Sequence, residues 1–402
     1  MKYIIYNYMK IHPFKKYIFE QVKRDVQATG HMMHLADLVT GNDEVAADPD
    51  AAIQHARLSR DTLDNQDTSD DGHEAHVKGD GSASFLGGID EEGKPFVSLK
   101  SGANRFYSHD DIRATGKDYH ERNLIPAFNT VSAMKNMKPG TAFQADILGD
   151  RDEGTHHDND TFTSNAVTYK TPSKNTFTYA PHSTYKVSGQ NMIRTGNKVD
   201  HSQLETGDAY PSRSVQLDID DDVTFDVSNS KLGMIDKHID AAAGHLSDET
   251  REFTKTLQGN TKFMRMFQRR SNEHHRNYVN DRDMAGSGKR SVDDLRSFVP
   301  HYVENNRRVK PALQQQEIES HTKFINDNAH HFDNIFNAQN SLQKANKGMV
   351  QQFNKHNDQY DLQTADGHNH EGFVSHLAGA TSVKLVDDFA EKNAIEARRF
   401  QQ

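Results

Sequence analysis

Apolar residues recur every three or four positions along two long stretches of the chain, residues 11–40 and 314–354. This spacing places them on one face of an amphipathic α-helix. The apolar positions are Phe14, Tyr17, Ile18 and Val22 in the first stretch and Ile318, Ile325, Ala329, Phe332 and Phe336 in the second. We therefore predict a helix over each stretch, the first continuing through His31-Met32-Met33-His34-Leu35.

Polar residues mark the starts of further helices. Asp48 is followed by a proline, which combines a preferred N-cap with a favoured first helical residue, so we expect a helix from there to about Leu63. Ser247 precedes two acidic residues, which suit the positive end of a helix dipole. Ser291 has capping-box spacing to an aspartate three residues later. These signals predict that residues 240–357 form a helical insertion.

Short segments with β character lie before this insertion. Segments 82–87 and 96–99 are separated by a glycine-containing turn, which predicts a hairpin. Segment 141–148 alternates apolar and polar residues, which is typical of a strand with one buried face. Between them we predict a helix over roughly 109–137, broken by Pro126.

The remaining strand-like segments complete a mixed pattern. They are 175–179 with 183–187, 215–219 with 224–227, and, after the insertion, 372–376 with 382–386. We therefore predict an α+β protein. Its expected parts are an N-terminal helical segment over 1–70, the first part of a mixed β-sheet core over 71–239, the helical insertion over 240–357, and the completion of the core over 358–402.

Composition narrows the classes of protein. The 402 residues suffice for two or three domains, but only 34% are hydrophobic and 26% are charged, so we expect long exposed helices around a modest core. The absence of cysteine excludes disulfides and thiolate chemistry. No apolar run approaches the ~20 residues of a membrane span, and the N-terminus has no continuous apolar segment typical of a secretory signal. We expect a cytoplasmic protein, neither secreted nor in a membrane.

One short motif suggests chemistry. His76-Val77-Lys78-Gly79-Asp80-Gly81 has the form of a strand that ends in Lys-x-Asp-Gly. Other short elements follow in order: Leu99-Lys100-Ser101-Gly102, Phe143-Gln144-Ala145-Asp146-Ile147, Thr176-Phe177-Thr178-Tyr179-Ala180, Glu371-Gly372-Phe373-Val374 and Val383-Lys384-Leu385.

This ordered set resembles the covalent nucleotidyltransferases, the superfamily of ATP-dependent DNA and RNA ligases and mRNA capping enzymes. The resemblance covers roughly residues 70–230 and 365–390. It implies a ligase-like core in which Lys78 is the nucleophile of a Lys-x-Asp-Gly motif that includes Asp80. Together with His31-Met32-Met33-His34-Leu35, the chain also resembles an uncharacterised protein family of tailed bacteriophages.

The resemblance implies roles for the other residues. Gly81, Lys100, Phe177 and Lys384 would bind ATP, with Phe177 stacking on the base and Lys384 at the α-phosphate. Asp146 and Glu371 would hold Mg²⁺, because hard cations prefer carboxylate oxygens. A lysine amine attacks phosphorus only when it is unprotonated, so burial or neighbouring cations such as Lys100 and Lys384 must lower its pKa.

The same residues imply ATP-dependent adenylyl transfer, with RNA or DNA end joining in a phage-infected cell as the expected outcome. Several features depart from DNA ligases. Ser82-Ala83-Ser84 stand where many DNA ligases carry an arginine, Val386 replaces a second lysine after Lys384, and about thirty residues after Glu371 are too few for an OB domain. An RNA-ligase-like or degenerate member fits better. The alternatives are a non-catalytic phage accessory or structural protein with a ligase-like fold, and an adenylyltransferase that acts on protein.

Simpler interpretations remain open for these residues. Asp80-Gly81 is also a common hairpin turn, Asp146 suits a solvated strand position, and Phe177 suits a core. The arginines Arg265, Arg269, Arg270 and Arg276 lie among aromatic residues and form a candidate nucleic-acid patch or a solvated helix face. The net charge of −10 argues against a broader nucleic-acid surface. None of the histidine groups has a recognised zinc spacing.

Overall fold

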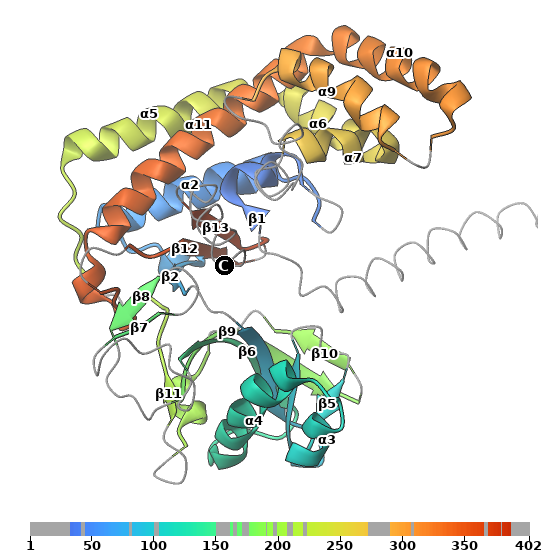
Figure 1. Ribbon diagram of the computed structural model, residues 1–402. Helices are drawn as coiled ribbons and strands as arrows, with labels where there is room; N and C mark the ends of the chain where they lie inside the picture. The colour runs from blue at the N-terminus through green and yellow to red at the C-terminus, as the bar shows by residue number, and fades with distance from the viewer. Residues whose placement is uncertain are drawn as a thin grey trace, which may run out of the picture. The chain divides into compact units, whose positions relative to one another are not determined.

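We describe the protein from a computed structural model (Figure 1). The described residues are 33–41, 45–79, 83–99, 104–149, 161–163, 167–170, 177–189, 191–195, 199–206, 212–219, 223–271, 290–306, 309–365, 369–378 and 380–386. They combine helices and sheets, so the mixture of helices and strands expected of an α+β protein is confirmed. Among the described helices, none has the length and apolar character that a membrane span requires.

The described residues belong to two compact units. The β unit contains the described residues between Gly79 and Leu217 and those between Asp361 and His368. The helical unit contains the described residues between Met32 and Lys78, those between Asp218 and Tyr360 and those from Asn369 onward. The chain therefore leaves the helical unit directly after Lys78 and returns to it at Asp218.

The β unit is built on a seven-stranded sheet with the order β10-β9-β6-β3-β4-β5 and with β11 beside β9. Its strands are β3 Ala83–Ile89, β4 Pro95–Leu99, β5 Arg105–Phe106, β6 Thr141–Gly149, β9 Phe177–Ser188, β10 Asn191–Arg194 and β11 Ser212–Ser214. β7 Thr161–Thr163 pairs with β8 Thr168–Lys170. The helices of this unit are α3 His109–Arg113, α4 Asp118–Ala133 and the 3₁₀-helix η3 His201–Leu204.

One face of this sheet forms the larger core of the β unit. Phe85, Val97 and Phe143 belong to the same buried cluster as Leu124, Ala127 and Val131 of α4. The opposite face buries a smaller cluster that includes Leu86, Phe96 and Tyr185. Strand alternation produces this division, since successive side chains point to opposite faces.

The helical unit contains a four-stranded sheet with the order β1-β13-β12-β2. Its strands are β1 Met33–His34, β2 His73–Lys78, β12 Gly372–Leu377 and β13 Val383–Val386. The helices are α2 Pro49–Leu63, α5 Asn229–His245, α6 Asp248–Gly259, α7 Thr261–Ser271, α9 Val292–Glu304, α10 Pro311–Asp327 and α11 Ala329–Asn354, with the 3₁₀-helices η1 Leu35–Val39, η2 Ser69–Asp71 and η5 Asn357–Gln359.

Helix α11 is the central helix of the helical unit, and several other elements pack along it. Its buried positions follow a regular three-four spacing: Phe332, Ile335, Gln339, Leu342, Asn346, Met349 and Phe353. This spacing keeps one stripe of the helix facing its neighbours. Near its start, Phe332 and Phe336 pack against Phe263 and Phe267 of α7, whereas Phe353 near its end packs against Phe373 of β12, with 4.6 Å between the ring centroids.

Two amides in this stripe bind backbone carbonyl groups of other elements. Gln339 donates to the carbonyl of Ala36 in η1 at 3.3 Å, and Asn346 donates to the carbonyl of Val386 at the end of β13 at 2.9 Å. Both side chains are buried, so these bonds satisfy carbonyl groups at a depth where an unpaired one is costly.

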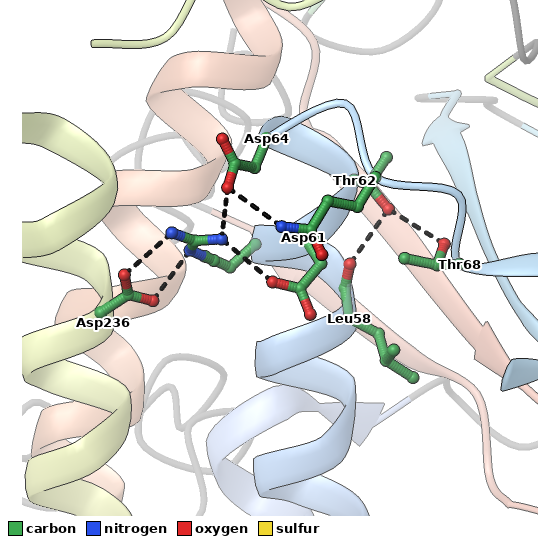
Figure 2. A network of polar contacts seen from close by, with 8 residues as sticks. Leu58, Asp61, Thr62, Asp64, Thr68 and Asp236 are labelled. Carbon is green, nitrogen blue, oxygen red and sulfur yellow. Dashed lines mark hydrogen bonds and ion pairs between the residues drawn. The ribbon is translucent and has the colours of Figure 1, made fainter. Parts of the chain in front are cut away.

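A charged network joins α2 to α5. Asp61, Asp64 and Asp236 converge on the guanidinium group of Arg60 (Figure 2). Arg60 Nη1 lies 2.8 Å from Asp64, and Arg60 Nη2 donates to Asp236 of α5 at 3.0 Å. A second ion pair is deeply buried, with Arg290 at 3.8 Å from Asp37 of η1.

Most predicted elements are confirmed. Asp48 accepts a hydrogen bond from the amide of Ala51 at the start of α2, and Ser247 and Ser291 cap α6 and α9 in the same way. The hairpin of β3 and β4 and the strands β6, β12 and β13 lie where the sequence predicted them.

Five predictions of local structure are wrong. The stretch 314–354 is not one helix, because the chain breaks at Asn328 between α10 and α11. Pro126 does not break its helix. It lies inside α4, and the break comes earlier, around Gly116, whose φ of +64° suits glycine.

The other three concern strands. Segments 175–179 and 183–187 are not a pair, since one continuous strand, β9, runs through Pro181 with a bulge against β6 that absorbs the irregularity. Segments 215–219 and 224–227 form no strands beyond a single bridge at Asp218. Met33–His34 is a strand rather than helix because it pairs in parallel with β13.

We predict that Asn346→Ala destabilises the helical unit. The substitution leaves the buried carbonyl of Val386 without this donor, which typically costs about 1–3 kcal/mol. Urea unfolding followed by circular dichroism measures the effect. Lys344→Ala, at an exposed position of the same helix, is the matched control, and equal midpoints for the two variants would contradict the role given to Asn346.

Candidate functional site

The four-stranded sheet brings Lys78 and Glu371 together. Lys78 is the last residue of β2 and pairs in register with Gly372, the first residue of β12, so Glu371 is the residue directly before that strand. The Lys78 ammonium group is in ion-pair contact with the Glu371 carboxylate. The two side chains are 24% and 11% exposed, which leaves the pair partly shielded from water but reachable from solvent.

Lys384 lies on the same face of the sheet. It pairs in register with Val374 of β12, and Val374 pairs with His76 of β2, which is two residues before Lys78. Because residues in register share a face and alternate residues return to it, Lys78, His76 and Lys384 all point to one side. Lys384 is only 6% exposed, an unusual depth for a lysine.

This side of the sheet carries several further polar groups. His76 Nδ1 lies 2.9 Å from Asp218, and its Nε2 lies 3.5 Å from Glu74. The ring of His376 packs edge-on against that of His76, with 4.4 Å between centroids, and bonds to Ser382. We call this side the charged face. It carries lysine, histidine and carboxylate groups on three adjacent strands and on the segment at Asp218.

Burial and hydrogen bonding compete at His76. Burial alone would lower the pKa of the imidazole, but the hydrogen bonds and negative charges of Asp218 and Glu74 raise the pKa above its ordinary value. The backbone reinforces the contact, since Asp218 forms a β-bridge with His76 and the amide of Ile219 donates to the carbonyl of Ala75 at 3.0 Å.

Two other residues predicted to bind metal or nucleotide, Asp146 and Phe177, belong to the β unit, where they lie on β6 and β9. Asp146 is partly exposed and lies 3.7 Å from His182. Phe177 is 0% exposed and stacks on Tyr179 within the core, so it presents no free face to a base in this arrangement. Asp80, Gly81 and Lys100 lie outside the described residues.

The arginine cluster is on α7, within the helical unit. Arg265 and Arg269 are exposed, and the Arg269 guanidinium lies 5.7 Å from the ring centre of Tyr302. Arg270 is in ion-pair contact with Asp294 and lies over Phe298. Arg276 lies outside the described residues. Since α7 packs near the start of α11 and β12 near its end, the two places are about 30 Å apart along that helix, at ~1.5 Å per residue.

A divalent metal has one suitable ligand beside Lys78. Within the described part of the chain, no group of three or more histidine or acidic residues is arranged to hold a metal ion. Mg²⁺ commonly uses one or two carboxylates and completes its shell with water and substrate phosphates. Glu371 fits the role of one such carboxylate, whereas Asp146 belongs to the other unit.

Sequence reasoning missed His76, Glu74 and Asp218. The first two have a local signal, because Glu74, His76 and Lys78 alternate with less polar residues along one strand. Asp218 has none. It reaches His76 only because the chain returns from the β unit at that point.

We predict that Asp218→Asn moves the pKa of His76 from above its ordinary value of 6.5 to below it. With the stronger acceptor charge removed, burial becomes the dominant influence. Histidine ¹H–¹⁵N spectra across a pH titration measure this directly. In the wild type, the stability that His76 contributes is fully present below pH 6.5 and is lost as pH rises through its raised pKa. An unchanged His76 titration in the variant would contradict this account.

Comparison with known proteins identifies only the family to which the chain belongs. No curated protein matches the chain, and no solved structure matches it. A family model described as a family of unknown function, DUF6267, matches residues 29–397, which is most of the chain. The chain therefore belongs to the DUF6267 family.

Proposed function

We propose that the protein transfers adenylyl groups from ATP through a covalent intermediate on Lys78. The observation that carries this proposal is the contact between Lys78 and Glu371 on a face that also holds the buried Lys384. The three residues come from the Lys-x-Asp-Gly, Glu-Gly-x-Val and final lysine elements of the resemblance. The first element is far from the other two in sequence, yet the three strands β2, β12 and β13 are adjacent in one sheet.

The proposed step is a displacement at the α-phosphorus of ATP. The Lys78 ammonium first gives a proton to Glu371 or to water, because only the free amine is a nucleophile. Its nitrogen then attacks, a nitrogen–phosphorus bond forms, and the bond from the α-phosphorus to the bridging oxygen breaks. Pyrophosphate leaves with that electron pair, and the nitrogen loses a second proton to give Lys78–AMP.

The charged face has groups for the other requirements of this step. Phosphoryl transfer depends on in-line positioning and on charge stabilisation. Lys384 and His76 place basic side chains on the side where the triphosphate would lie, and Glu371 has the ligand type that Mg²⁺ needs. A bound Mg²⁺ would supply charge neutralisation at the phosphates. Glu371 also holds Lys78 in place before ATP arrives.

The proposed acceptor is the 5′-phosphate of a nucleic acid end, joined or repaired in the cytoplasm of a phage-infected cell. AMP would pass to that phosphate, and a neighbouring 3′-hydroxyl would displace it. Arg265 and Arg269 support nucleic-acid contact because both are exposed on one face of α7 and neither has a described carboxylate partner of the kind that Arg270 has. The alternative proposal, a non-catalytic phage protein of ligase-like fold, predicts nucleotide binding without transfer.

We predict that protein incubated with α-³²P-labelled ATP and Mg²⁺ becomes labelled and that Lys78→Arg abolishes the label. Arginine preserves the charge facing Glu371, but its guanidinium stays protonated and cannot attack. Denaturing gel electrophoresis measures the label. Lys94→Ala, at an exposed hairpin lysine, controls for general damage. Glu371→Gln should slow labelling by roughly 100-fold if Glu371 takes the proton.

An absence of label from the folded wild type with ATP, GTP or NAD would sink the enzymatic proposal. Label that persists in Lys78→Arg would refute Lys78 as the nucleophile while leaving transfer intact.

A separate prediction concerns the arginines of α7. Arg265→Ala with Arg269→Ala should weaken binding of a DNA or RNA duplex at all sequences and reduce the slope of log affinity against log salt by roughly 1 for each lost phosphate contact. Fluorescence anisotropy across a salt series measures both quantities. Lys255→Ala, an exposed cation on α6, is the control. Unchanged affinity and slope would exclude this surface as a phosphate contact.

A further inference from the structure

The side of the four-stranded sheet opposite the charged face buries two histidines and a serine. His55 comes from α2, His73 from β2 and Ser375 from β12, and none is more than 2% exposed. Both histidines contact the same hydroxyl, because His55 Nδ1 and His73 Nε2 each lie 2.8 Å from Ser375 Oγ. The three residues therefore join α2 to two strands through one polar centre.

The hydrogen bonds around this centre have only one consistent direction. His55 Nε2 lies 3.0 Å from the carbonyl of Thr381, which can only accept, so this nitrogen carries the proton. His55 Nδ1 must then accept from the hydroxyl of Ser375. Ser375 in turn accepts from His73 Nε2, which leaves His73 Nδ1 to accept from Thr68 at 3.0 Å.

Thr68 lies beside the end of α2. Thr62 donates to the carbonyl of Leu58 at 3.0 Å, and its oxygen lies 3.4 Å from that of Thr68 (Figure 2). Ser59 of the same helix lies 3.5 Å from His73 Nε2. We call the series from Thr68 through His73, Ser375 and His55 to Thr381 the histidine relay.

Each histidine in the relay is neutral, with one nitrogen donating and the other accepting. An added proton converts an acceptor into a second donor, so a neighbouring hydroxyl must turn and give up its own bond. The proton also places a charge in a site closed to water. Burial lowers the pKa of both His55 and His73 to about 4.

The charges around His55 and His73 do not offset the lowering of their pKa values by burial. Asp48 at the start of α2 favours the charged form of His55, and Glu74 on β2 favours that of His73, while His76 on β2 opposes it. The two relay histidines also oppose each other's protonation. Because the pKa of each histidine is lower in the folded protein than in the unfolded chain, its contribution to stability is present above pH 6.5 and is lost as pH falls towards 4.

We propose that the histidine relay is an acid-sensitive latch that holds α2 on the sheet bearing Lys78 and releases it when the relay takes up protons. The latch is independent of the proposed adenylyl transfer, since none of its residues lies on the charged face.

Hydrogen–deuterium exchange of the full chain at about pH 7.5 and about pH 5 tests the latch, with rates corrected for intrinsic exchange. The shift of each pKa from 6.5 to about 4 predicts that local opening of α2 becomes about 30-fold more frequent at about pH 5 for each histidine released. His76, with its raised pKa, works in the opposite direction over this range and offsets part of the change.

The double variant His55→Gln with His73→Gln isolates the effect. Glutamine can donate through its nitrogen and accept through its oxygen but does not titrate, so the acid response of α2 should disappear. His245→Gln, at the end of α5, is the matched control and should keep the response. Unchanged α2 exchange at about pH 5 in the wild type, or an acid response that survives in the double variant, would overturn the proposal.

Nuclear magnetic resonance titration of the wild type decides the matter if the double variant fails to fold. Titration of His55 and His73 well below the ordinary histidine range would support the latch, and titration near pH 6.5 would overturn it.

Discussion

The three-four spacing of buried residues on α11 is the constraint on which the helical unit depends. A single stripe of this helix contacts α7 near its start, η1 at Gln339, β13 at Asn346 and β12 at Phe353. The helix therefore meets η1, β13 and β12 in that order along its length. The register of the strands fixes the charged face, because a slip of one residue would turn Lys384 and His76 toward the helices.

The two sides of the four-stranded sheet accommodate polar side chains in different ways. The helix-packed side satisfies its histidines with a neutral, one-directional series of hydrogen bonds that excludes charge. On the charged face, Lys78 pairs with Glu371, and the hydrogen bond and negative charge of Asp218 raise the pKa of His76. Histidines three residues apart on β2, His73 and His76, consequently have pKa values that move in opposite directions. Environment, not residue type, decides the direction in which each pKa moves.

Much of the fold and part of the site follow from the sequence. Capping residues located α2, α6 and α9, alternation located β6, and strand-like composition located β12 and β13. That Lys78 and Glu371 belong to one site was implied only by the resemblance, since no local pattern reveals which distant strands become neighbours. Asp218 and the relay partner His55 were beyond sequence reasoning for the same reason. Local propensity also failed at Pro126, whose missing amide hydrogen is tolerated within α4, and at Asn328, which separates two helices of similar periodicity.

The claim that links these observations is that the charged face binds the triphosphate of ATP with its α-phosphorus at Lys78. A crystal structure with a non-hydrolysable ATP analogue and Mg²⁺ tests it most directly. Our account predicts the α-phosphate beside Lys78 and Lys384. An analogue bound away from the charged face at saturating nucleotide would contradict it.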